Sequence, residues 1–151
     1  MLFRSKGLLP FEVSREAVDR LHADVVLERN PELSYLEPEA SNAAQHILNG
    51  LFSDGWMLGE ASVLLKTPAK YSGLKVSVFI PPNAPARTVT LSVDGKVVAT
   101  QTFQTPGPYT VTGPFQTDAD QVTVTLRVDR THRVAPDTRD LGVVVIGVGF
   151  E

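Results

Sequence analysis

TVTLSVDGKVVATQTF, residues 88–103, is the stretch that decides the fold. Hydroxyl and apolar side chains alternate over residues 88–93, which is the period of a strand with one buried face. Asp94-Gly95 follows, and this dipeptide is typical of a tight two-residue hairpin turn. We expect residues 96–103 to return as the antiparallel partner strand. The stretch therefore predicts a β-hairpin whose apolar face is covered by other elements.

Similar signals recur along the chain after residue 60. GLKVSVFI (residues 73–80) and QVTVTLRV (residues 121–128) alternate in the same way, with valine, leucine and isoleucine on one face. A shorter strand is expected at residues 109–112, after the turn residues Pro106-Gly107-Pro108. Since no helical pattern separates them, about seven or eight such strands predict a mostly β protein, an antiparallel β-sandwich.

The last strand differs from the others. LGVVVIGVGF, residues 141–150, is apolar on both faces. Such a strand is either central and covered on both sides, or it faces a partner. Its glycines indicate close packing, a bend or a bulge.

The first part of the chain has another texture. Residues 1–50 are charged and poor in strand patterns, so we expect a partly helical segment that packs on a sandwich of residues 51–151. Ser14 could cap a helix over residues 15–21, and residues 23–28 could form a strand. A second helix is expected over residues 38–48, with Asn49-Gly50 as its stop.

Composition and motifs favour a protein without cofactor, metal or catalytic machinery. The net charge of −3 gives no reason to expect nucleic-acid binding, and the lack of cysteine excludes thiol chemistry and cysteine metal sites. No nucleophile elbow, phosphate loop or zinc-protease motif occurs. The three histidines have no ligand spacing, and Asp118-x-Asp120 is a polar turn before a strand rather than a calcium loop.

The compartment is inferred from the start of the chain and from its apolar runs. The start of the chain, MLFRSKGLLPF, has too short an apolar run for a signal peptide, and no run reaches transmembrane length. We therefore expect a cytoplasmic protein without membrane insertion, or an extracytoplasmic one if the chain is processed or a fragment.

Two places could carry a binding site. Trp56, the single tryptophan, stands in SDGWMLGEA near Asp54, and aromatic rings stack on sugar faces. The long polar loop of residues 129–140 mixes arginines with carboxylates, which recognise hydroxyl pairs and anions. The ligand-binding candidates are Asp54, Trp56, Arg130, Arg133, Arg139 and Asp140.

Each candidate also has a structural interpretation. A large aromatic side chain beside a strand start is most often packed, so Trp56 could be a plug at the sandwich end. The neighbouring Arg139 and Asp140 could form a salt bridge that only fixes the loop.

The sequence also resembles a known family. The Asp54-Gly55-Trp56 start, the TVTLSVDG hairpin, the PGPY turn and the closing DTRDLG of residues 137–142 are similar to an accessory β-sandwich domain. This domain occurs in bacteria beside glycosyltransferases and in envelope-polysaccharide proteins. The match covers about residues 46–151. It implies a galactose-binding-like jelly roll and carbohydrate binding without catalysis, but it carries over no established binding residues.

Three functions remain open at this point. The leading hypothesis is a non-catalytic glycan-binding module linked to bacterial glycan or polysaccharide synthesis or modification, with a glycan or a glycan-processing protein as partner. The second is a protein-interaction or oligomerisation module that associates through the C-terminal strand. The third is a polysaccharide-active enzyme without a recognisable motif, since fold alone does not decide function.

Overall fold

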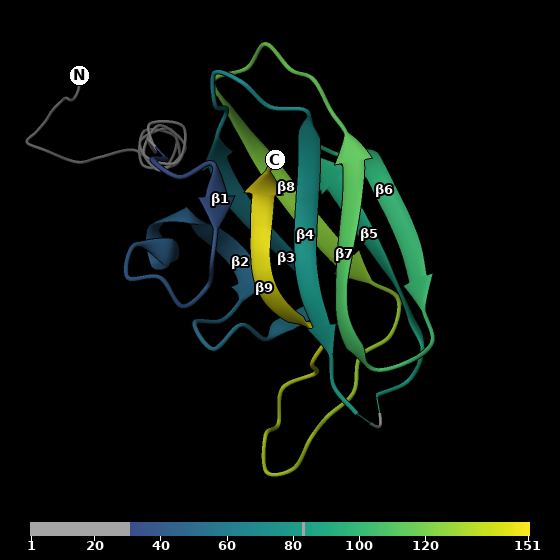
Figure 1. The fold of residues 1–151 in the computed structure, drawn as a ribbon. Helices are drawn as coiled ribbons and strands as arrows, with labels where there is room; N and C mark the ends of the chain where they lie inside the picture. The colour runs from purple at the N-terminus through teal and green to yellow at the C-terminus, as the bar shows by residue number, and fades with distance from the viewer. Residues whose placement is uncertain (1–30, 83) are drawn as a thin grey trace, which may run out of the picture. The chain divides into compact units, whose positions relative to one another are not determined.

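The protein is an antiparallel β-sandwich, as the sequence predicts. The computed structural model describes residues 31–82 and 84–151. Within these residues a four-stranded sheet has the order β1-β9-β4-β7, and a five-stranded sheet has the order β2-β3-β8-β5-β6 (Figure 1). The elements are β1 (Tyr35–Leu36), η1 (Ala43–His46), β2 (Ile47–Leu51), β3 (Met57–Lys66), β4 (Gly73–Ile80), β5 (Arg87–Val93), β6 (Lys96–Phe103), β7 (Gly107–Pro114), β8 (Gln121–Val128) and β9 (Val144–Phe150).

The predicted hairpin is confirmed. β5 pairs with β6 from Arg87↔Phe103 to Val93↔Lys96. Asp94 and Gly95 have φ angles of 49° and 87°, and two successive positive values are what a type I′ turn requires. The backbone twist of this turn matches that of the flanking strands, so the sequence sets both the turn and the register.

The core follows the alternation seen in the sequence. The apolar faces of β4, β5 and β8 point between the two sheets, where burial of each large aliphatic side chain contributes about 1.5–3 kcal/mol. The side chains predicted to share these faces are all buried: Leu74, Val76, Val78, Ile80, Val89, Leu91, Val93, Val122, Val124, Leu126 and Val128.

The helix expected over residues 38–48 is wrong. The structure has only the single 3₁₀ turn η1, followed directly by β2. Ile47 pairs with Val63 and Leu51 with Met57, so these residues complete an edge of the five-stranded sheet. His46 is buried and its Nε2 accepts the backbone N–H of Leu33 at 3.2 Å, which ties the turn to the preceding chain.

The sequence analysis placed the start of the sandwich at residue 51. Strands β1 and β2 belong to the two sheets, so the sandwich also includes residues before 51. The helix expected over residues 15–21 and the strand expected over residues 23–28 lie outside the described residues. In the described part of the chain, no helix has the length and apolar character needed to cross a membrane.

The sequence left open whether the C-terminal strand is central in a sheet or faces a partner. In the structure it is central. β9 lies between β1 and β4, and most of it is buried. A bulge interrupts its pairing with β4 after Ser77↔Gly147. The Tyr35 ring lies where a side chain at position 147 would point, so the glycine there serves close packing. Ile146 stays 47% exposed, which leaves one large apolar side chain of β9 on the outer surface.

Candidate functional site

Trp56 lies at one end of the sandwich, where the two sheets are joined. The Trp56 carbonyl accepts the Phe52 N–H at 2.9 Å, which closes a tight turn over residues 52–56. On its other side the same segment pairs with the chain entering β9, through an isolated Trp56↔Val144 bridge. The Met57 N–H donates to the Val143 carbonyl at 3.1 Å. The backbone of Trp56 is therefore held from both sides, while its side chain is half-buried.

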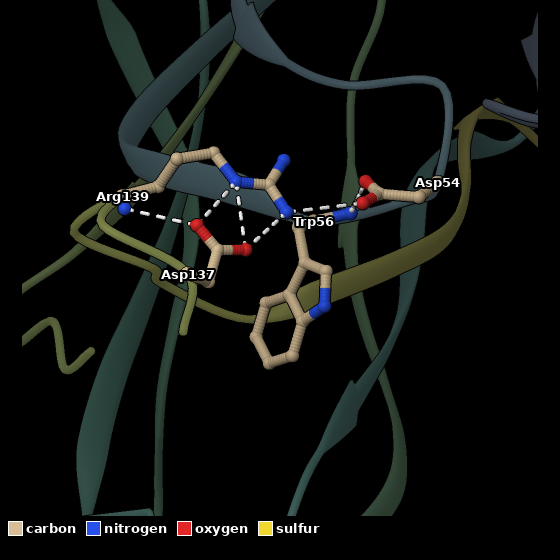
Figure 2. A network of polar contacts seen from close by, with 4 residues as sticks. All are labelled: Asp54, Trp56, Asp137 and Arg139. Carbon is tan, nitrogen blue, oxygen red and sulfur yellow. Dashed lines mark hydrogen bonds and ion pairs between the residues drawn. The ribbon is translucent and has the colours of Figure 1, made fainter. Parts of the chain in front are cut away.

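An arginine joins this turn to the loop between β8 and β9, residues 129–143. Arg139 Nη2 donates to Asp54 Oδ2 at 3.1 Å and to Asp137 Oδ2 at 2.6 Å, and its Nε also contacts the Asp137 carboxylate (Figure 2). The Arg139 guanidinium lies 4.5 Å from the centre of the Phe52 ring. Asp54 Oδ1 accepts the Trp56 N–H at 3.1 Å. The network thus fixes the main chain of Trp56.

The indole ring itself points away from this network. Figure 2 shows the ring extending away from the Arg139 guanidinium and the Asp54 carboxylate, while the Asp137 carboxylate is drawn on the ring's side of the Trp56 backbone. The ring instead meets the His132 imidazole edge-on, with 6.0 Å between the ring centroids. Asp54 and Arg139 were both proposed from the sequence as ligand-binding residues. Their contacts hold the main chain of Trp56 and do not involve its ring.

The network also sets the charge of its members. Hydrogen bonds from the Arg139 side chain and backbone lower the pKa of Asp137 from 3.8 to about 2. Hydrogen bonds to Asp137 and then Asp54 raise the pKa of Arg139 above its ordinary value. Asp137 and Arg139 therefore remain charged at neutral pH. The carboxylates of Asp54 and Asp137 accept hydrogen bonds from the N–H groups of Arg139, which occupies these donors within the network.

A second ion pair links the two arms of the loop. Arg133 Nε donates to Asp140 Oδ1 at 2.6 Å, and both side chains are well exposed. The hydrogen bond lowers the pKa of Asp140 and raises that of Arg133. The pairing expected between Arg139 and Asp140 is thus wrong. His132 and Leu141 exchange backbone hydrogen bonds, which brings the next residue of each arm, Arg133 and Asp140, together instead.

Arg130 is exposed and has no ion pair or hydrogen bond with another of the described residues. It lies near the start of the same loop. Of the five charged candidates, it is the one that forms no ion pair with another side chain in this part of the chain.

Arg87 and His132 are site residues that the sequence did not reveal. Arg87 is 1% exposed, and its guanidinium donates to the carbonyls of Pro85 and Gly142 and to His132 Nδ1. Burial lowers its pKa, whereas the nearby charge of Asp129 raises it. The position of Arg87 in the alternating strand could have revealed its burial, because residue 87 lies on the same inward face as Val89. A charge at an inward position indicates a buried cation that needs partners.

A hollow of about 430 Å³ lies beside the turn that carries Trp56. Phe52 and Ser53 from the turn form part of it, with apolar side chains of the η1 region opposite. A second hollow, of about 420 Å³, lies between residues 37–40 and Val145 and Ile146 of β9. In the described part of the chain no three histidine, aspartate or glutamate side chains gather as a metal site.

Comparison with known proteins yields two distant fold likenesses. No protein-family model matches the chain, and no curated protein matches it. An acetyl xylan esterase from the rumen bacterium Butyrivibrio proteoclasticus is 17% identical, with a TM-score of 0.48, over 79% of this chain and 32% of the esterase. A family 35 carbohydrate-binding module from an environmental isolate is 14% identical, with a TM-score of 0.46, over 78% of this chain and 91% of the module.

The chain thus spans about a third of the esterase. At these TM-scores neither likeness carries weight, and the assignment of a β-sandwich rests on the strand pairing described above.

Proposed function

We propose that this protein is a non-catalytic carbohydrate-binding β-sandwich that assists a bacterial enzyme of glycan or polysaccharide synthesis or modification. The binding site is the end of the sandwich formed by the Trp56 turn and the β8–β9 loop. Trp56 supplies the ring on which a sugar stacks, and Asp54 and Arg139 hold the turn that carries it. Arg130, Arg133 and Asp140 lie on the adjoining β8–β9 loop. The link to glycan synthesis rests on the sequence resemblance alone.

The observation that carries the proposal is the position of the indole. A pure plug would be enclosed, but the Trp56 side chain is half-buried while its backbone is clamped on both sides. Thr67 Oγ1 is the one buried side-chain oxygen or nitrogen without a partner among residues 31–82 and 84–151. The Trp56 indole N–H has no hydrogen bond with another of these residues, and it is not among their buried unpaired atoms. A half-buried aromatic ring on a fixed main chain, with an N–H donor at its edge, suits a sugar ring.

The site is expected to bind weakly. The carboxylates of Asp54, Asp137 and Asp140 are already engaged by arginines, so few acceptors are left for sugar hydroxyls. A shallow polar surface gains little free energy after desolvation and ordering of the ligand. We therefore expect the protein to act through avidity or through its partner enzyme rather than through high affinity.

The test is a pair of aromatic truncations measured by calorimetry on a glycan that binds the wild-type protein. Trp56→Ala should weaken binding at least about tenfold, as expected for an aromatic anchor. Phe79→Ala is the matched control, because Phe79 is exposed on β4 of the other sheet and should leave binding unchanged. Equal affinity of both variants would refute the proposed site. Thermal unfolding confirms that each variant is folded.

A second function is favoured by one observation. Phe79 and Ile146 are both exposed apolar side chains on the neighbouring strands β4 and β9 of the four-stranded sheet. This face could associate with a second copy of the chain. If so, the mass measured by analytical ultracentrifugation rises with concentration, and Ile146→Lys abolishes the rise. Val97→Lys, on β6 of the opposite sheet and 60% exposed, serves as the control.

A further inference from the structure

The buried Arg87 determines the hydrogen-bonding state of a half-buried histidine, His132. Its Nη2 lies 3.3 Å from His132 Nδ1. A guanidinium has no acceptor atom, so the imidazole nitrogen must accept this hydrogen bond. A neutral imidazole that accepts at Nδ1 carries its proton on Nε2. The contact therefore fixes His132 as an Nε2–H donor.

Arg87 is itself held rigidly. Its Nε donates to the Pro85 carbonyl at 3.2 Å and its Nη1 to the carbonyl of Gly142, and its side chain is buried. The backbone of His132 is held independently, because its N–H donates to the Leu141 carbonyl at 2.9 Å and its carbonyl accepts the Leu141 N–H at 2.8 Å. Both the ring and the main chain of His132 are thus fixed before any ligand arrives.

The remaining nitrogen of the ring is open. His132 Nε2 has no hydrogen-bond partner in the described part of the chain, and it is absent from the buried unpaired atoms there. The ring packs edge-on against Trp56, with a 65° angle between the planes. The imidazole N–H and the indole N–H are therefore two open donors on adjacent rings at the same end of the sandwich.

We propose that His132 is a ligand-binding residue, which donates from Nε2 to an oxygen of the sugar stacked on Trp56, and that Arg87 is its positioning residue. The inference rests on the proposed function and adds a specific contact to it. The recognised group is an acceptor oxygen of the glycan, because both open groups on these two rings are donors. Preorganised donors lose little conformational freedom when the ligand binds.

Two substitutions of His132 separate its two nitrogens. In His132→Asn the amide oxygen replaces Nδ1 as the acceptor for Arg87, but no donor reaches the position of Nε2. In His132→Gln the longer side chain returns an N–H near Nε2 and leaves Arg87 without its acceptor. We expect His132→Asn to weaken glycan binding about tenfold and His132→Gln to weaken it only about two- to threefold, by the worth of one hydrogen bond.

The role of Arg87 is tested by ¹⁵N NMR of the imidazole, which needs no ligand. The wild-type protein should show a pyridine-like Nδ1 and a pyrrole-like, protonated Nε2 for His132, assigned by their loss in His132→Asn. Arg87→Lys, which keeps the charge but not the fork of donors, should give mixed tautomers and a smaller loss of affinity, about twofold where the Nε2–H form is half populated. A structural role alone would not change the tautomer.

The outcomes are distinguishable. An Nδ1–H tautomer in the wild-type protein overturns the inference whatever glycan binds. Unchanged glycan affinity in His132→Asn also overturns it, while Trp56→Ala can still uphold the proposed function. A wild-type protein that binds no glycan refutes the proposed function and the donor role with it. If Arg87→Lys does not fold, the two variants at the half-buried His132 decide the question.

Discussion

Arg139 joins Asp54 and Asp137 through a single nitrogen, Nη2, at 3.1 and 2.6 Å. Asp54 and Arg139 are 85 residues apart in the sequence. The contact connects the turn before β3 to the loop before β9, at the end of the sandwich where Trp56 lies. Because Asp54 also accepts the Trp56 N–H, the ion pair and the position of the candidate binding residue are coupled.

This coupling predicts different effects for two substitutions of Asp54. Asp54→Asn keeps the side-chain oxygen that accepts the Trp56 N–H and loses the charge. Asp54→Ala loses both. We expect hydrogen exchange of the Trp56 amide to stay slow in the first variant and to accelerate in the second. Equal exchange rates in both variants would show that the carboxylate does not hold the turn.

The lowered pKa of Asp137 predicts the pH range in which its contribution to the stability of the loop is lost. Its pKa in the folded protein is about 2, below the ordinary 3.8, so folding favours the charged form. The contribution of this group to stability is therefore present above about pH 4, and it is lost as the pH falls through about 2. Carboxyl ¹³C NMR of Asp137 should show a titration midpoint near 2.

The matched variant is Arg139→Ala, which removes the hydrogen bonds that lower the pKa of Asp137. In this variant the midpoint of Asp137 should return towards about 3.9. A wild-type midpoint near 4 would contradict the bidentate contact between the two side chains.

Arg87 predicts a large loss of stability. Arg87→Met removes the donors to the carbonyls of Pro85 and Gly142, and buried groups without partners are costly. We expect the free energy of unfolding to fall by about 2–4 kcal/mol in urea titrations. Arg127→Met is the control, because its ion pair with Glu60 is exposed, and the change there should stay below about 1 kcal/mol. Similar losses in both would contradict a structural role for Arg87.

Arg130 predicts an effect on binding without an effect on stability. Its side chain is exposed and has no ion pair with another described residue, so Arg130→Ala should leave the thermal unfolding temperature unchanged. If Arg130 contacts the glycan from the loop, its affinity should fall about two- to fivefold. Lys96→Ala, at the exposed hairpin start of β6, should have no effect. A similar affinity in the two variants would remove Arg130 from the site.

The strands could be predicted because their signal is local. Alternation places Leu74, Val76 and Val78 on one face whatever the rest of the chain does, and Asp94-Gly95 specifies its own turn. The helix predicted over residues 38–48 was wrong for the opposite reason, because the structure there depends on distant residues. The composition of residues 38–48 suits a helix, but pairing of Ile47 and Leu51 with β3 decides the outcome, and that pairing depends on distant residues.

The candidate site could be predicted only in part. The sequence identified the Trp56 turn and the arginine-rich loop, and the structure places both at one end of the sandwich. It could not assign partners within the loop, because Arg133 meets Asp140 through the backbone pairing of His132 with Leu141. No role could be assigned to His132 from the sequence, since nothing near it in sequence reveals the buried Arg87 that fixes its ring.

The most direct test of the central claim is a glycan array probed with the purified chain, followed by titration of any bound glycan while Trp56 emission is recorded. Trp56 is the single tryptophan, so the emission reports on this residue alone. The proposed function predicts binding to one glycan class, with a shift in emission and protection from a soluble quencher. No binding, together with blue emission that is insensitive to the quencher, would contradict it and make Trp56 a packing residue.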